Sequence, residues 1–232
     1  MDGILLVDKP AEWTSMDVCA HLRGVLHERH VGHTGTLDPN ATGLLVVLTG
    51  KGTKAAKYAE NDTKAYVARL RLGMRTDTQD IWGTVLESNG KTRSREELEA
   101  VLPRFRGEIL QLPPMYSAIK IRGKKLYEIA RRGGSVDREP RPITIFRLEV
   151  TGQEDNGDWI LEIECSKGTY IRTLCADIGE ALGCGGCMSA LRRVRAGVFD
   201  IAEAHTLEEI RANPEGFILP LTRITGEVTG NG

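Results

Sequence analysis

The chain has 232 residues, enough to bury the core of one large domain or of two small ones. Its formal net charge of −1 excludes a protein that attracts polyanions over its whole surface, so nucleic-acid binding would need basic residues gathered on one face. No apolar run approaches the ~20 residues that span a bilayer, and no signal-peptide pattern opens the chain. The five cysteines, an odd number, indicate a reducing cytoplasm.

Strand and helix patterns are interspersed in the first half of the chain. Thr14 and Ser94 stand where hydroxyl side chains cap helices, and Ser94 opens a capping box with Glu97. Residues 64–72 alternate apolar and polar side chains, which places Tyr66 on the inward face of a strand. The expected elements are a strand, a helix, a short helix, a strand, its hairpin partner and a helix, in the order Gly3–Asp8, Thr14–Leu26, Gly52–Glu60, Lys64–Leu72, Gly83–Glu87 and Ser94–Leu102.

The second half adds further strands, a basic helix and the clearest helical pattern of the chain. That pattern lies over residues 169–182, where apolar residues recur at helical spacing. The mixture of helices and expected hairpins predicts an α+β fold with a mixed sheet. Strands are expected over Gly107–Leu112, Ser117–Ile121, Ile143–Thr151, Trp159–Cys165 and Arg193–Ile201, and helices over Lys124–Arg132, Thr169–Leu182 and Thr206–Ala212.

One loop, Gly32–Gly43, gathers glycines and polar side chains around a single carboxylate, that of Asp38. The glycines permit backbone conformations that other residues resist, and Pro39 restricts Asp38 to extended backbone angles. A rigid polar loop that presents one acid is typical of enzymes with a nucleophile or a base. Taken alone, however, such a loop more often is a surface turn with a capping aspartate.

Six motifs that follow one another along residues 3 to 200 change that interpretation. They resemble the motifs of the TruB family of tRNA pseudouridine synthases, and six matches in order are much more specific than any single one. The motifs are LLVDKP (Leu5–Pro10), GHTGTLDPNATGLL (Gly32–Leu45), KAYVARLRLG (Lys64–Gly73), PPMYSAIKIRGKKLYEIARRG (Pro113–Gly133), CSKGTYIRTLCADIG (Cys165–Gly179) and LRRVRAGVF (Leu191–Phe199).

The resemblance implies the pseudouridine synthase fold, an α+β fold whose long, curved, mixed and largely antiparallel sheet is flanked by helices. It implies one catalytic domain over residues 1–222, with an RNA-contacting insertion at about 107–142, and a tail over 223–232. Many family members continue into an RNA-binding PUA domain, for which we expect no room after Leu221. Glu12 is a second departure, because the family usually has glycine there.

The resemblance also implies the catalytic residues. Asp38 would attack C1′ of the target uridine or abstract its C2′ proton, and Arg172 would pair with it. By helical spacing, Arg172 lies off the apolar stripe, where an arginine usually faces solvent, although a guanidinium can hold a carboxylate bidentately and keep it ionised. Tyr66 would stack on the uracil and move a proton, whereas its spacing alone favours a core aromatic.

Four more residues are implied to bind the substrate. Tyr170 would line the same pocket, and Leu191 would contact the base, which does not exclude a place in the core. His33 would fill the stack that the flipped nucleotide leaves, although an acid–base role is conceivable for any histidine. Lys9 would support the cleft from beside it, while its position alone fits a solvated lysine at a strand end.

A basic run supports RNA contact independently of the motifs. The segment from Lys120 to Arg132 has six basic residues and one acid, Glu128, whereas residues 200–232 have two arginines against six acids. A neutral chain needs such an asymmetry to bind RNA on one side, although a charge run alone is often a solvated face. In the family, the matching insertion closes over the tRNA T-arm. The basic residues are Lys120, Arg122, Lys124, Lys125, Arg131 and Arg132.

The resemblance thus predicts a cytoplasmic, monomeric enzyme that isomerises the uridine at position 55 in the tRNA T loop. The reaction involves no redox change, so we expect no cofactor and no metal, and no partner besides tRNA. Cys184 and Cys187 have the spacing of half a zinc site, but the chain has no second pair. The alternatives are a non-catalytic RNA-binding or tRNA-folding protein, and a nucleoside hydrolase, which would want a second acid near Asp38.

Overall fold

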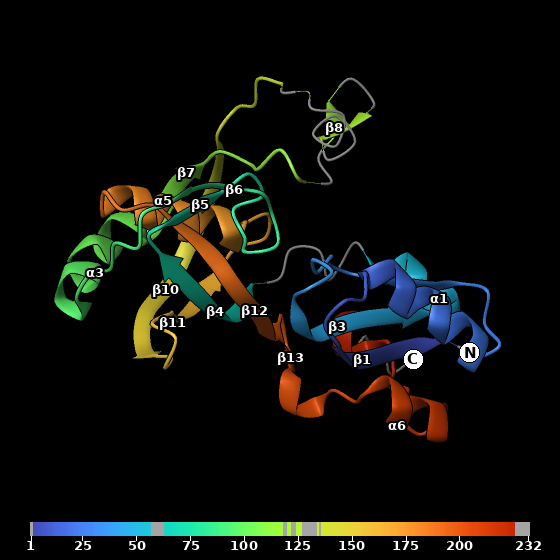
Figure 1. The fold of residues 1–232 in the computed structure, drawn as a ribbon. Helices are drawn as coiled ribbons and strands as arrows, with labels where there is room; N and C mark the ends of the chain where they lie inside the picture. Colours follow the sequence, from blue (N-terminus) through green and yellow to red (C-terminus); the bar gives the residue numbers. More distant parts are fainter. Residues whose placement is uncertain are drawn as a thin grey trace. The chain divides into compact units, whose positions relative to one another are not determined.

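The chain forms two compact units. The first unit joins Met1–Val67 with Leu191–Gly232, and the second is Ala68–Ala190. In Figure 1 the first unit is therefore drawn in blue and red and the second mainly in green, yellow and orange. Among the described helices, none is long and apolar enough to cross a membrane. The computed structural model describes residues 2–56, 63–117, 120–121, 124–126, 134 and 136–225.

The strands of the first unit are arranged around two long antiparallel neighbours, β1 (Gly3–Lys9) and β3 (Thr42–Thr49). The unit also contains β2 (Val31–His33), the end of β12 (Gly186–Ala196) and β13 (Phe199–Asp200). β1 and β3 pair along their whole length, from Gly3 opposite Thr49 to Lys9 opposite Gly43. β2 adds to β3 antiparallel, β12 adds to it in parallel at Arg192–Arg193, and β13 returns along β12.

Local sequence signals set the helix starts in this unit. Its helices are α1 (Ser15–Val25), α6 (Leu207–Ala212), α7 (Thr222–Thr225) and the 3-10 helices η1 (Gly50–Ala55) and η3 (Ile201–Glu203). Thr14 caps α1 by accepting from the backbone N–H of Asp17, whose carboxylate accepts from Thr14 N in return. Thr206 and Glu209 repeat this capping box at α6, which leaves few helix-end donors unpaired.

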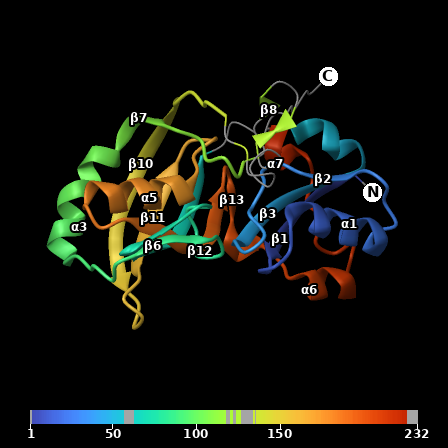
Figure 2. The same ribbon diagram turned by 45° about the horizontal axis from the view of Figure 1, so that its top comes forward.

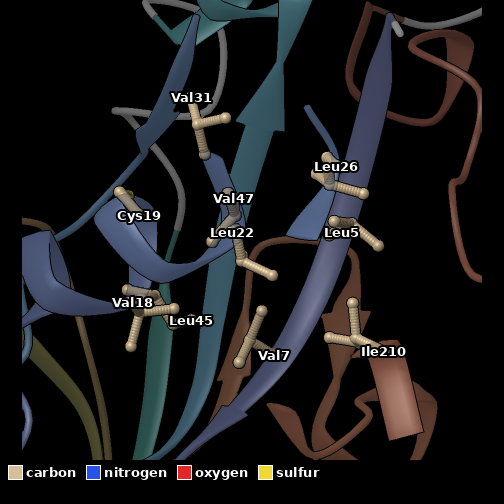
Figure 3. Packing of buried hydrophobic residues seen from close by; sticks show 10 residues of the cluster. All are labelled: Leu5, Val7, Val18, Cys19, Leu22, Leu26, Val31, Leu45, Val47 and Ile210. Carbon is tan, nitrogen blue, oxygen red and sulfur yellow. The ribbon is translucent and has the colours of Figure 1, made fainter. Parts of the chain in front are cut away.

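The core of the first unit covers both faces of β1 and β3, which is why both strands read as continuous apolar runs. Figure 3 shows one of its two clusters, in which side chains of α1 pack toward β1 and β3. Full burial of one such aliphatic side chain stabilises a fold by ~1.5–3 kcal/mol. The cluster contains Leu5, Val7, Val18, Cys19, Leu22, Leu26, Val31, Leu45, Val47 and Ile210, and so ties the two ends of the chain together.

In the second unit, β4, β11, β10 and β7 are hydrogen-bonded neighbours in that order. Helix α3 lies beside β10 in both ribbon views (Figure 1, Figure 2), and Arg95 of α3 donates to the carbonyl of Val150 of β10 at 2.8 Å. The pairings of β10 with β11 and with β7 are antiparallel. The strands are β4 (Lys64–Leu72), which begins in the first unit, β7 (Gly107–Gln111), β10 (Arg141–Gln153) and β11 (Trp159–Cys165); the helices are α3 (Arg95–Val101), η2 (Leu102–Phe105) and α5 (Ile171–Ala181).

The expected α+β fold with a mixed, largely antiparallel sheet is confirmed, but three local predictions are wrong. The segment 83–87 does not pair with β4: strand β6 (Val85–Ser88) pairs with β5 (Met74–Thr76). The predicted basic helix does not begin at Lys124, because β9 (Lys124–Lys125) pairs with β8 (Lys120–Ile121). The last long strand, β12, starts at Gly186 rather than at Arg193, and its hairpin with β13 interrupts the predicted run.

Candidate active site

The loop that carries Asp38 connects β2 to β3 in the first unit and is anchored beside that residue. Leu37 is buried, its N–H donates to Ser15 Oγ at 2.8 Å, and the same hydroxyl donates to the Leu37 carbonyl at 3.1 Å. On the other side, Ala41 N donates to the Asp38 carbonyl at 3.1 Å and closes a turn. These contacts fix the backbone on both sides of a half-buried carboxylate, as a site that positions a reacting group requires.

Lys9 holds the next residue of the loop. Its side chain is fully buried, and the ammonium group donates to the carbonyls of Pro10 at 2.7 Å, Trp13 at 2.6 Å and Pro39 at 2.9 Å. An ammonium group has three donors, so all of them are used. Burial lowers the pKa of Lys9 to about 8, while the nearby negative charge of Asp38 acts in the opposite direction. The predicted supporting position of Lys9 thus has a physical basis in its bond to Pro39.

Arg193 bonds to the loop on both sides of Asp38 in the sequence. The sequence interpretation gave Arg193 no role. Its side chain is fully buried, Nε donates to the Leu44 carbonyl at 2.7 Å, and Nη2 donates to the Gly35 carbonyl at 3.0 Å. One guanidinium therefore bonds to residues before and after Asp38. The available signal was the Arg192-Arg193 pair on a strand, because successive strand residues point to opposite faces and one of the two must point inward.

His33 ends β2 and is partly buried close to this guanidinium. Burial lowers the pKa of His33, and the positive charge of Arg193 lowers it further. The imidazole is therefore neutral at neutral pH. Within the part of the chain that the structure describes, its buried Nδ1 has no hydrogen-bond partner. A neutral imidazole is better suited to stacking on a base than to acting as a general acid.

Tyr66 and Leu191 are both buried and both belong to the first unit, as Asp38 does. Tyr66 lies near the start of β4, where the alternation of the strand also buries Ala68 and Leu70, as the sequence predicts. Leu191 lies on β12 directly before Arg192. Their proposed contacts with a base stay predictions, and burial in the core is compatible with both roles.

Arg172 is the second residue of α5 in the second unit, and it is buried rather than solvated. Its guanidinium donates to the carbonyls of Thr78 at 3.0 Å and Tyr116 at 2.9 Å, and its Nη1 lies 3.8 Å from Asp80 Oδ2. These bonds fix its orientation. The sequence interpretation missed Asp80, for which the polar run Thr76–Asp80 was the only signal. The pairing of Arg172 with Asp38 stays a prediction.

Tyr170, directly before α5, is held through its backbone. The buried Gln111 of β7 accepts from Tyr170 N at 2.8 Å and donates to the Tyr170 carbonyl at 3.0 Å. This two-bond clamp replaces a side-chain cap at the start of the helix. Gln111 was not predicted, because a glutamine that ends an apolar strand gives no signal of the helix it will meet.

The predicted basic patch falls largely outside the described residues. Lys120, Lys124 and Lys125 lie on β8 and β9, with their side chains not described, and Arg122, Arg131 and Arg132 lie outside the described residues altogether. Cys184 and Cys187 are buried free thiols. Among the described residues, no group of three or more histidine, cysteine or acidic side chains is arranged to hold a metal ion.

Comparison with known proteins identifies the family to which the chain belongs. A model of the N-terminal domain of TruB family pseudouridylate synthases matches residues 23–171, and a model of the tRNA pseudouridylate synthase B C-terminal domain matches residues 172–217. The chain therefore belongs to the TruB family.

Individual relatives agree with the family match. The tRNA pseudouridine synthase B of Alkaliphilus oremlandii is 47% identical over 223 residues, which cover 95% of this chain and 74% of the relative. That of Pseudomonas fluorescens (strain Pf-5) is 49% identical over 213 residues, covering 91% and 69%.

Two solved structures confirm the pseudouridine synthase fold. A chain of a Cbf5-Nop10-Gar1 complex matches with a TM-score of 0.76 and 29% identity, covering 96% of this chain and 61% of that one. A chain of an H/ACA RNP bound to a substrate RNA containing 2′-deoxyuridine matches with a TM-score of 0.72 and 27% identity, covering 96% and 60%. This chain thus spans about three fifths of the length of each matched chain.

Proposed function

We propose that this chain isomerises uridine to pseudouridine in tRNA, and that its target is the T-loop uridine at position 55. One observation carries the proposal: in a TruB-family chain, the loop of Asp38 is fixed by buried groups on both sides, Lys9 at Pro39 and Arg193 at Gly35 and Leu44. The relatives named tRNA pseudouridine synthase B support tRNA as the substrate.

The proposed reaction rearranges bonds within one nucleotide. The glycosidic bond between C1′ and N1 breaks, the uracil turns, and C1′ bonds to C5, which loses its hydrogen as a proton while N1 gains one. Positive charge develops on the sugar as the base leaves, and a carboxylate facing C1′ stabilises it, as in glycoside chemistry. Asp38 takes this role, either by attack on C1′ or by removal of the C2′ proton.

Access to C1′ requires that the nucleotide leave its stack, at a cost of a few kcal/mol. A neutral His33 ring can occupy the vacated position without bringing a positive charge into the base stack. We expect Tyr66 to stack on the flipped uracil and to move the proton, with Tyr170 and Leu191 lining the pocket. Arg172, already oriented by two carbonyl contacts, would pair with Asp38 and keep it ionised.

The remaining proposals concern the whole chain. Residues 1–222 would form the catalytic domain, and the insertion at about 107–142 would contact the T-arm through its basic run. We expect a monomer without cofactor or metal. The five free cysteines, all buried, support a reducing cytoplasm as its location.

The test measures pseudouridine in an unmodified tRNA transcript incubated with purified protein alone. Asp38→Asn should fold, bind tRNA and form no pseudouridine, and a transcript with cytidine at position 55 should remain unmodified by wild-type protein. Asp17→Asn is the matched control, because it removes the carboxylate of an exposed capping box in the same unit. It should lose some stability, because the bond that Asp17 accepts from Thr14 N is weakened, and keep its turnover.

The outcomes separate the proposal from its alternative. Wild-type turnover by Asp38→Asn would refute the role of Asp38. A wild-type protein that binds tRNA, forms no pseudouridine and still promotes tRNA folding would favour the non-catalytic RNA-binding protein.

A further inference from the structure

Two consecutive arginines of β12 make entirely different contacts. Arg192 is partly exposed and forms a bidentate pair with Asp8 of β1, at 3.0 and 2.7 Å. Arg193 points to the other face, is fully buried, and donates to the backbone carbonyls of Gly35 and Leu44. A buried guanidinium is costly unless its charge is compensated and its donors are bonded. A buried arginine that bonds to two loop carbonyls therefore requires an explanation.

We propose that Arg193 is a positioning residue that holds both ends of the Asp38 loop and so sets where the carboxylate points. The proposal rests on the proposed function. Gly35 precedes Asp38 by three residues and Leu44 follows it by six, and both carbonyls bond to the same planar group. Because that group is rigid, the separation of the two loop ends is fixed.

The short pairing of β12 with β3 brings Arg193 to this position. Arg192 lies opposite Thr42 and Arg193 opposite Gly43, at the point where the loop enters β3. The Gly35 backbone comes so close that a Cβ there would lie 3.5 Å from Arg193 Nη1. The guanidinium is thus in direct contact with the loop, so a change at Arg193 is transmitted to Asp38 through backbone atoms.

The charge of Arg193 provides a second, spectroscopic signature. It acts on two other titratable groups of the site, Lys9 on β1 and His33 on β2, and lowers the pKa of each in addition to burial. Asp38 acts on Lys9 in the opposite direction. In a folded protein, removal of the Arg193 charge should therefore raise the pKa of His33, whereas a lysine at this position, which keeps the charge, should leave that pKa low.

The experiment compares three variants of the whole chain in single-turnover pseudouridine formation at saturating tRNA. Arg193→Lys keeps the charge but cannot bond to both carbonyls in the same geometry, and Arg193→Met removes the charge as well. Arg192→Met is the matched control, since it removes the neighbouring charge that does not touch Gly35 or Leu44. Because a misplacement of ~1 Å can cost ~100-fold in rate, we expect a loss of at least ~10-fold for Arg193→Lys, ~100-fold for Arg193→Met, and less than ~2-fold for Arg192→Met.

Two further readouts separate positioning from unfolding. The dissociation constant for tRNA should stay within about threefold of wild type in both Arg193 variants, so the loss is in the rate of the bound complex. The His33 pKa, measured by NMR of the imidazole carbons, should rise in Arg193→Met and remain low in Arg193→Lys. If Arg193→Met does not fold, Arg193→Lys and its rate carry the test.

A folded Arg193→Lys with the wild-type rate would overturn the proposal, and so would an equal loss in Arg192→Met. These results are distinct from failure of the proposed function, which would show as a wild-type protein that forms no pseudouridine. They are also distinct from failure of the role of Asp38, which would show as an active Asp38→Asn.

Discussion

Gly43 offers the sharpest test of how the loop joins the sheet. It is the second residue of β3 and has a φ of +97°, which L-residues rarely adopt. A Cβ added there would overlap the Arg193 carbonyl oxygen and would lie 2.9 Å from the Arg193 nitrogen and 3.1 Å from Arg192 Cγ. Both closest atoms belong to the backbone of β12, so no side-chain rotation relieves the overlap.

The magnitude for Gly43→Ala follows from two contributions. The left-handed backbone conformation costs an L-residue ~1–2 kcal/mol, and overpacking against fixed backbone costs ~1–3 kcal/mol. The sum, about 2–5 kcal/mol, is a large part of the ~5–15 kcal/mol that typically stabilises a protein. Since β12 must shift to accommodate the methyl group, Arg193 moves with it and turnover should fall as well.

The assay is urea unfolding combined with hydrogen exchange of the peptides that cover β2 and β3. Exchange reports the local free energy of opening of the first unit even if the two units unfold separately. Gly32→Ala is the matched control, because a Cβ at Gly32 on β2 would meet no atom within 4 Å. It should change stability by less than ~0.5 kcal/mol. A Gly43→Ala protein within ~1 kcal/mol of wild type would refute the steric argument.

Three other changes give distinct expected results. Tyr66→Phe should bind tRNA as wild type does and lose most of its turnover, and an equal loss of binding would argue against a chemical role for the hydroxyl. Glu12→Gly should raise the free energy of unfolding by ~0.5–1 kcal/mol, measured in urea, because Glu12 has a φ of +66° that glycine adopts without strain. In Asp158→Asn, the free energy of unfolding should fall less than in wild type as the pH is lowered. Burial would raise the pKa of the Asp158 carboxyl, but hydrogen bonds from Arg71 and Ser189 outweigh burial and hold this pKa below its ordinary value of 3.8. Its stabilising contribution is therefore present above pH 3.8 and lost as the pH falls through the folded-state pKa, so urea midpoints of wild type and variant that fall equally from pH 5 to pH 3 would contradict it.

Elements whose cause is local were predictable from the sequence. The helices after Thr14 and Ser94 begin where predicted, because a capping box involves residues only three apart. The partner of residues 83–87 was not predictable in this way. In the sheet order, β12 and β11 already occupy the two edges of β4, and β6 pairs with β5 instead. Pairing depends on which edges of a strand are already occupied, and local spacing does not contain that information.

In the candidate site, too, some residues could be predicted from the sequence and others could not. Asp38 and Lys9 stand in motifs that the family resemblance made recognisable. Arg193 stands in such a motif too, yet its partners are the carbonyls of residues 149 and 158 positions away along the chain. Backbone carbonyls are present at every residue, so no residue type marks them as partners in the sequence. The left-handed conformation of Glu12 was equally hidden, although the family's usual glycine at that position indicated where to look.

The division of the first unit between the two ends of the chain has a consequence for biosynthesis. The ribosome delivers β1, α1 and the Asp38 loop first, then the whole second unit, and only afterwards Arg193, Ile210 and Leu219, which pairs with Ile4. The contiguous second unit can fold while translation continues. The loop of Asp38 must instead wait, with an incomplete core, until the residues from Leu191 onward have been synthesised. Until Arg193 and Ile210 have been synthesised, β1 and β3 lack part of the core that covers them, and their apolar side chains can be bound by chaperones.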